Sequence, residues 1–225
     1  MEGRKNRLSI RSLMKWIALL FIVIGIGVIS FPFVQNQYVA YEQDKLLHQL
    51  EAEEGQEVSG EESLPQRYEE LNAILDQEAA STTSPETKEK PSKNLIGKME
   101  ISAINLELPI LNGASMENLK VAVGRLSGTG IPGEVGNTAL AAHRSYKYGK
   151  LFNRLDEVKI GDSINIETGN HTYAYQVENV FRVLPTDLSV LKQPETGSIL
   201  TLITCDPIQD PTHRLIVQAS LVKTS

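Results

Sequence analysis

An uncharged apolar segment near the N-terminus constrains the organisation of this chain more than any other feature. Residues 16–34 read WIALLFIVIGIGVISFPFV, which is nineteen residues without a charge. At about 1.5 Å per helical residue, this length matches the roughly 30 Å hydrocarbon core of a bilayer. The segment therefore predicts a transmembrane signal anchor over residues 16–34, preceded by a short cytoplasmic N-terminus over residues 1–15.

The charges on either side of this segment predict its orientation. Before it, a single acid, Glu2, stands against five bases, which are Arg4, Lys5, Arg7, Arg11 and Lys15. This bias keeps the N-terminus in the cytoplasm and predicts a single-pass plasma-membrane protein whose remainder is extracellular. The alternative is a cleaved signal, but such apolar regions usually have about 7–15 residues and end in small residues, unlike Tyr38-Val39-Ala40.

Residues 35–93 differ in composition from the rest of the chain. Between residues 42 and 93 there are fourteen Asp or Glu residues against five Lys or Arg. Helical spacing of leucine and isoleucine occurs at residues 41–54 and 68–78, but neither piece has enough apolar surface for its own core. The expectation is an acidic, partly helical, solvated stalk. The alternative is a regulatory segment that covers an active site.

From residue 94 onward, short β-like runs alternate with turn residues, which predicts a barrel or a sandwich of about 130 residues. A short helix is expected at residues 116–123, with Ser115 as its N-cap, and another at 150–155. The net charge of −6 and the scattered bases give no sign of nucleic-acid binding. The predicted strands are residues 97–101, 106–111, 138–142, 163–167, 172–183, 199–205 and 215–222.

Cys205 is the only cysteine in a chain that is predicted to be exported. It cannot form an internal disulfide, and an exposed thiol outside the cell is a liability unless it is buried or used. The run before it is typical of a buried strand, and Asp206-Pro207 after it cannot continue a ladder. Cys205 is therefore expected at a strand end, either as a small core residue or as a nucleophile.

A nucleophilic thiolate needs a proton partner and a group that stabilises oxyanion charge. His143 fits the first role because it ends the strand-like run 138–142. Arg214 fits the second, since pairing of the strands around the connector 206–213 brings it near Cys205. The alternatives are an incidental histidine and an ordinary surface arginine. The other histidines are placed in the stalk, a turn and the connector; they are His48, His171 and His213.

Three ordered stretches resemble the sortase family. The stretch TLITC at 201–205, followed by Arg-Leu-Ile-Val at 214–217, resembles the family's TLxTC strand and its arginine strand. The stretch NTALAAHR at 137–144 is similar to the family's histidine strand. Residues 94–110 and 150–162 are similar to further segments, so the likeness covers residues 94–223. It is closest to class D, with class A second.

This resemblance implies a closed eight-stranded, all-β barrel with short helices over residues 94–225, in which His143, Cys205 and Arg214 converge. Cys205 would attack a C-terminal LPxTG-type sorting signal on a secreted protein and form a thioacyl enzyme. A peptidoglycan-precursor amine, on lipid II or its stem peptide, would then accept the protein. The chemistry requires no cofactor or metal. The resemblance also suggests four substrate-contacting or groove-lining residues, which are Thr201, Thr204, Leu140 and Ala142.

Three other functions stay open at this stage. A hydrolase would use the same residues and release its product to water. A non-catalytic exported barrel would hold Cys205 in its core. A pilus-polymerising sortase is disfavoured because no Asp-Pro-aromatic triplet occurs in residues 36–94, and because the chain ends at Ser225 without a second apolar segment.

Overall fold

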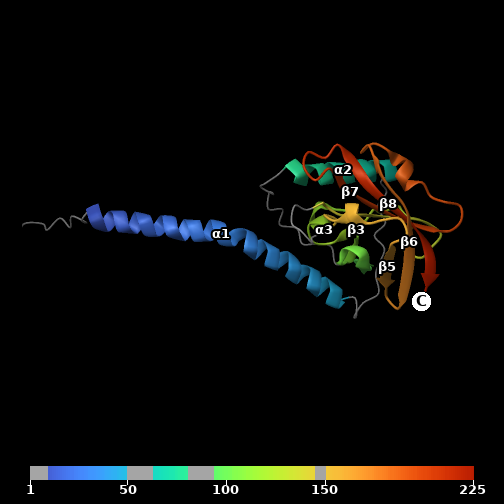
Figure 1. Ribbon diagram of the computed structural model, residues 1–225, viewed down its shortest axis with the longest axis horizontal. Coiled ribbons are helices and arrows are strands. Elements are labelled where there is room, and N and C mark those ends of the chain that lie inside the picture. The colour runs from blue at the N-terminus through green and yellow to red at the C-terminus, as the bar shows by residue number, and fades with distance from the viewer. Residues whose placement is uncertain (1–9, 50–62, 81–93, 145–150) are drawn as a thin grey trace, which may run out of the picture. The chain divides into compact units, whose positions relative to one another are not determined.

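The computed structural model describes residues 10–49, 63–80, 94–144 and 151–225 (Figure 1). Contacts divide the chain into two compact units, Met1–Tyr41 and Glu42–Ser225. Helix α1, Ile10–Gln49, includes the apolar segment at residues 16–34. Among the described residues, no helix is long and apolar enough to cross a membrane, so the transmembrane helix expected there is not supported by the structure.

Eight strands in the second unit form a closed barrel in the order β1-β2-β3-β4-β7-β8-β6-β5. The barrel closes where β1 pairs antiparallel with β5, and the pairs β2–β3 and β4–β7 are parallel. The all-β, eight-stranded prediction is therefore confirmed. The strands are β1 (Leu95–Ile101), β2 (Leu106–Asn112), β3 (Val123–Arg125), β4 (Gly136–Ala141), β5 (Ser163–Thr168), β6 (His171–Val183), β7 (Ser198–Asp206) and β8 (His213–Thr224).

Alternation along the strands divides the buried residues between two sides of the barrel wall. One cluster takes residues from all eight strands and therefore fills the interior. On β7 it includes Leu200 and Leu202, whereas Ile203 and Cys205 belong to a second cluster on the other side of the strand. Successive side chains of a strand point to opposite faces, so Cys205 lies on the outer face of the wall.

Short helices connect the strands. Helix α3, Met116–Val121, begins as predicted at Ser115, whose side chain accepts a hydrogen bond from the Asn118 amide at 3.3 Å. It ends before Val123, where β3 begins. The helix expected at residues 150–155 is not observed over the described residues 151–154, which form a bridge and turns ahead of the 3-10 turn η2, Leu155–Glu157. Two further 3-10 turns are η1, Ser102–Ile104, and η3, Leu188–Leu191.

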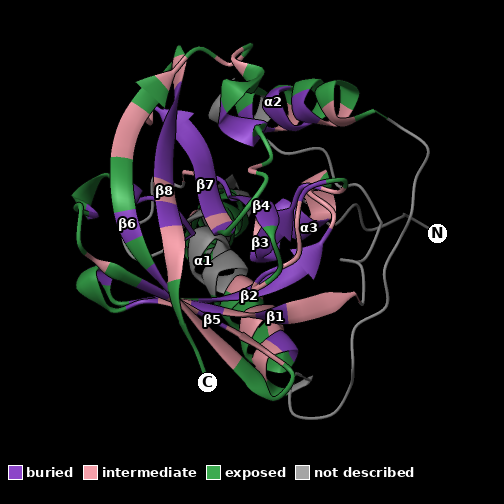
Figure 2. Ribbon diagram, turned by 90° about the vertical axis from the view of Figure 1, so that its right-hand side faces the viewer, coloured by how far each residue is buried: buried purple, intermediate pink, exposed green. Residues whose placement is uncertain are grey.

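Helix α2, Leu64–Ala80, lies in the segment predicted to be a solvated stalk. Ser63 precedes its first turn, and the Gln66 side chain accepts hydrogen bonds from the Ser63 amide at 3.1 Å and its hydroxyl at 2.8 Å. This arrangement resembles a capping box, which satisfies donors at a helix start. Figure 2 shows that the helix buries the face turned toward the barrel and exposes the opposite face.

The closure of the barrel predicts a strong effect for a substitution at Gly97 on β1. A Cβ at this position would lie 2.2 Å from the backbone oxygen of Glu167 on β5, so the paired strands would have to separate. We expect Gly97→Ala to lower the free energy of unfolding by about 3 kcal/mol. Urea unfolding of the chain measures this.

Gly169→Asn is the control, because a Cβ there meets nothing within 4 Å and asparagine tolerates the φ of +52° at this position. We expect it to change the free energy of unfolding by less than about 1 kcal/mol. Equal losses in the two variants would contradict the close approach of β1 and β5.

Candidate active site

Strand register brings His143, Cys205 and Arg214 to one side of the barrel wall. Cys205 on β7 pairs directly with Arg214 on β8. On the other side of β7, the parallel pairing with β4 runs to Ala141 opposite Ile203. Two residues further along both segments, His143 comes level with Cys205. Because side chains alternate, His143 points to the same outer face as Ala141. The structure thus brings together the three residues predicted to be catalytic.

Backbone contacts beyond the end of β4 hold the His143 segment beside β7. The Ala142 amide donates to the Ile203 carbonyl at 3.3 Å, and the Thr204 hydroxyl donates to the Ala142 carbonyl at 2.8 Å. On the far side, the Phe152 amide donates to the His143 carbonyl at 3.1 Å. The side chains of His143 and Cys205 are both buried.

The four further residues suggested by the resemblance lie on different sides of the barrel wall. Leu140 and Ala142 belong to the interior cluster, on the opposite side of β4 from the predicted catalytic residues. Thr204 is fully buried, and its hydroxyl is bonded to the Ala142 carbonyl. Thr201 shares the parity of Cys205, but its hydroxyl donates to Asn137 at 2.8 Å. In this structure none of the four is exposed to a ligand on the outer face.

Arg214 has 0% of its surface exposed and is held mainly by helix α2. Its Nε donates to the Asn72 side-chain oxygen at 2.6 Å, and its Nη2 donates to the Asn72 carbonyl at 3.3 Å. Nη2 also forms an ion pair of 2.8 Å with the half-exposed carboxylate of Asp76. Burying a guanidinium is costly unless it is paired, so these contacts make the position tenable.

Helix α2 also covers the thiol. The Cys205 Sγ donates to the backbone carbonyl of Leu75 at 3.6 Å, which is a weak hydrogen bond. The buried side chains of α2 pack in the outer cluster with Ile203, Cys205 and other residues of the barrel wall. The helix lies beside β7 in both views (Figures 1 and 2). The α2 side chains that are almost fully buried are Tyr68, Leu71 and Leu75.

The structure therefore differs from the expectation of a solvated stalk where α2 is concerned. The apolar spacing of residues 68–78 was visible in the sequence, but the spacing does not say what the helix packs on. The helix packs on the outer wall of the barrel. Its contacts with Cys205 and Arg214 agree with the alternative interpretation, in which this segment covers the active site. Sequence reasoning missed Asn72 and Asp76, which the structure joins to Arg214.

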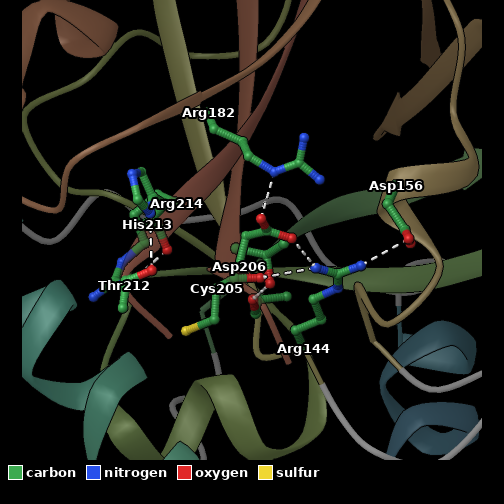
Figure 3. A network of polar contacts seen from close by, with 10 residues as sticks. Arg144, Asp156, Arg182, Cys205, Asp206, Thr212, His213 and Arg214 are labelled. Carbon is green, nitrogen blue, oxygen red and sulfur yellow. Dashed lines mark hydrogen bonds and ion pairs between the residues drawn. The ribbon is translucent and has the colours of Figure 1, made fainter. Parts of the chain in front are cut away.

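A network of charged residues lies directly behind the thiol (Figure 3). Asp206, the residue after Cys205, forms ion pairs with both Arg144 and Arg182. Burial raises the pKa of Asp206, but the hydrogen bonds from Arg182 and Arg144 outweigh it and hold that pKa below its usual value. Sequence reasoning also missed this network. Among the described residues, no cluster of His, Cys, Asp and Glu could hold a metal ion.

Comparison with known proteins agrees with the geometry. The protein-family model described as the sortase domain matches residues 99–222 of this chain. Sortase A of Bacillus anthracis is 30% identical over 92% of this chain and 94% of its own length. Sortase D of Bacillus subtilis is 30% identical, but over only 49% of this chain and 54% of its own length. Relatives of several classes thus match, and the expected class D membership is not confirmed.

Solved structures give the same result for the fold. The structure named "Sortase C1 of GBS Pilus Island 1" has a TM-score of 0.56 and 32% identity, covering 71% of this chain and 83% of that one. Sortase A of Listeria monocytogenes has a TM-score of 0.55 and 27% identity, covering 58% of this chain and 89% of that one. With the family model matching more than half of its length, the chain belongs to the sortase family and is a cysteine transpeptidase.

Proposed function

We propose that this enzyme cleaves an LPxTG-type sorting signal through a thioacyl intermediate on Cys205 and transfers the protein to a peptidoglycan amine. One observation carries the proposal: strand register places His143, Cys205 and Arg214 on one face of the barrel wall. The Leu75 carbonyl, 3.6 Å from the Cys205 sulfur, supports the proposal further, because a peptide carbonyl already lies beside the thiol on this face.

In the first half-reaction, the Cys205 thiolate attacks the threonine carbonyl carbon in the peptide bond between the threonine of the sorting signal and the next residue. The resulting tetrahedral oxyanion accepts hydrogen bonds from the Arg214 guanidinium, which carries a permanent charge. As the carbon–nitrogen bond breaks, His143 gives a proton to the leaving amine. The products are a thioester on Cys205 and a free C-terminal fragment.

In the second half-reaction, an amine from the peptidoglycan precursor attacks the thioester. His143 now accepts the proton that the amine loses, so one histidine serves as acid and then as base. The carbon–sulfur bond breaks, the thiolate is regenerated, and the secreted protein is joined to the cell wall by an amide bond. Lipid II or its stem peptide supplies such an amine.

A peptide can reach Cys205 only if helix α2 leaves the outer face. Leu75 occupies the position beside the thiol, and the guanidinium of Arg214 is engaged by Asn72 and Asp76. Displacement of α2 frees the donors of Arg214 for the oxyanion and uncovers the apolar surface of the outer cluster. Opening of α2 is thus a step before substrate binding in the proposed reaction.

Pilin polymerisation is a second candidate function. The similarity to "Sortase C1 of GBS Pilus Island 1" and to "Pilus-related Sortase C of Group B Streptococcus" favours it, at 32% and 27% identity. The two functions differ in the acceptor. Cell-wall anchoring uses a peptidoglycan amine, whereas pilin polymerisation would use a lysine side chain of a pilin subunit. Competition between a stem-peptide amine and a pilin-derived lysine peptide in one reaction separates them.

The first prediction of this proposal concerns the chemistry. The chain is incubated with a panel of LPxTG-type peptides and an amine, and we expect a thioacyl adduct at Cys205 by mass spectrometry and an amide product. His143→Ala should lower kcat/KM by about 10²–10⁴-fold, because a proton donor and acceptor is lost. Arg214→Lys should lower it by about 10²–10³-fold, because the guanidinium fork is lost.

His171→Ala is the matched control, since His171 is an exposed histidine at the start of β6. It should leave kcat/KM within about twofold of the wild type. Absence of any adduct at Cys205 across the panel would overturn the proposal. An adduct that ends only in free acid would identify a hydrolase in its place.

The second prediction concerns access to the thiol. Asp76→Asn removes the ion pair between α2 and Arg214, which is worth about 1 kcal/mol for a half-exposed partner. We expect Cys205 to be alkylated by iodoacetamide about fivefold faster than in the wild type. Glu70→Gln removes the same charge from an exposed position on α2 and should change nothing. Equal rates in all three chains would show that α2 does not limit access.

We also propose, from the sequence, that residues 16–34 anchor the chain in the plasma membrane, with the N-terminus in the cytoplasm and the catalytic domain outside. The nineteen uncharged residues and the bases before them support this orientation. In a Gram-positive host, we expect the chain to resist carbonate extraction and residues 42–225 to be digested by protease added to intact cells. Full protection from the protease would contradict this orientation.

A further inference from the structure

Opposite charges directly follow two of the three predicted catalytic residues. Arg144 comes after His143, and Asp206 comes after Cys205. Because neighbouring side chains along a strand point to opposite faces, this pair lies behind the thiol and the imidazole. Figure 3 shows the Asp206 carboxylate pointing toward Arg144 and Arg182 and the Cys205 sulfur pointing away from them. The pair therefore contacts the scaffold of the site and leaves the substrate face free.

Arg144 joins the two catalytic segments through three acceptors. Its Nη1 donates to the carboxylate of Asp206 and, at 3.4 Å, to the backbone carbonyl of Cys205 itself. Its Nη2 forms an ion pair of 2.9 Å with Asp156 in η2. One side chain thus ties the residue after His143 to the backbone of Cys205.

Asp206 is held from a second direction by Arg182 on β6. The Nε of Arg182 donates to Oδ2 of Asp206 at 2.5 Å. The side chains of Arg144 and Asp206 are only 5% and 12% exposed. The depressed pKa of Asp206 keeps its carboxylate charged at neutral pH. The Arg182 side chain is 59% exposed, so the buried part of the network is the pair Arg144–Asp206. Charge-assisted hydrogen bonds are short and directional, so these two residues hold each other firmly.

Arg144 and Asp206 lie just beyond the point where the backbone pairing of β4 and β7 ends. The paired residues of β4 and β7 end at Ala141 and Ile203, two residues before His143 and Cys205. Beyond this point the spacing of the imidazole and the thiol depends on individual contacts. A displacement of about 1 Å in a catalytic group can cost about 10²-fold in rate. A rigid link across the end of the ladder is therefore of direct use to the chemistry.

We propose that Arg144 and Asp206 form a positioning clamp that fixes His143 relative to Cys205 for both half-reactions. The clamp rests on the proposed transpeptidase function. Neither residue touches the substrate, so the clamp acts on kcat and leaves KM largely unchanged. Lysine cannot replace Arg144, because a single ammonium does not reach Cys205, Asp206 and Asp156 in the geometry of the guanidinium fork.

The test is a double-mutant cycle in the full chain with Arg144→Lys and Asp206→Asn. We expect each variant to lower kcat, expressed per acylatable Cys205, by about 10- to 100-fold, with KM within about twofold. If the two residues act as one unit, the double variant loses no more than the worse single variant. The cycle is repeated with Asp76→Asn in every chain, so that opening of α2 does not mask the effect.

Glu157→Gln is the control. It breaks the ion pair between Arg154 and Glu157, which is also an arginine–carboxylate pair but includes none of the residues of the site. It should leave kcat unchanged. If Arg144→Lys and Asp206→Asn fold poorly by thermal denaturation, Asp156→Asn takes their place, since it removes only the half-exposed outer partner of Arg144. We expect it to lower kcat by about two- to fivefold.

A readout without substrate separates the clamp from the proposed function. The ring signals of His143 in the NMR spectrum, assigned by difference from His143→Gln, should shift in Asp206→Asn and stay in place in Glu157→Gln. Unchanged ring signals, wild-type kcat in the folded variants, or independent losses that multiply in the double variant would each overturn the clamp. A wild-type chain that turns over no peptide would overturn the proposed function instead, and the ring signals would still decide the clamp.

Discussion

The pairing of β7 with a parallel strand on one side and an antiparallel strand on the other is the constraint on which the site depends. The parallel partner, β4, brings His143 level with Cys205, and the antiparallel partner, β8, sets Arg214 directly opposite it. Because side chains alternate along each strand, a shift of one residue in either register would turn a predicted catalytic side chain into the barrel interior. The interior cluster, which draws on all eight strands, makes such a shift costly.

The burial of Arg214 links this arrangement to helix α2. A guanidinium with no exposed surface needs partners, and α2 supplies an amide at Asn72 and a carboxylate at Asp76. The same helix sets the Leu75 carbonyl against the thiol. The covered state therefore keeps the charge of Arg214 satisfied, and in the proposed reaction a substrate carbonyl takes the place of α2. On the other side of β7, a second set of charges backs the site, so the outer face can open while the spacing of His143 and Cys205 stays fixed.

Alternation of apolar residues predicted seven of the eight strands, because each of them has a long enough β-like run. Strand β3 was missed because it has only three residues and follows α3 after one residue. The three residues predicted to be catalytic are brought together, but Leu140 and Ala142 face the interior. Because every second side chain of a strand points to the same face, counting back from His143 along β4 would have placed Ala139 and Ala141 on the outer face instead. The surface on which α2 packs, and the contacts between Arg144 and Asp206, involve segments that are distant in the sequence. Periodicity along one segment does not reveal such contacts.

The most direct measurement of the central claim is a crystal structure of the chain with a sorting-signal peptide trapped as a covalent adduct on Cys205. We predict that the peptide carbonyl lies within hydrogen-bond distance of Arg214 on the outer face of β7, that His143 lies beside the sulfur, and that α2 has left both Cys205 and Arg214. An adduct in which Asn72 and Asp76 still hold Arg214 and the peptide lies elsewhere would contradict the roles assigned to Arg214 and to α2.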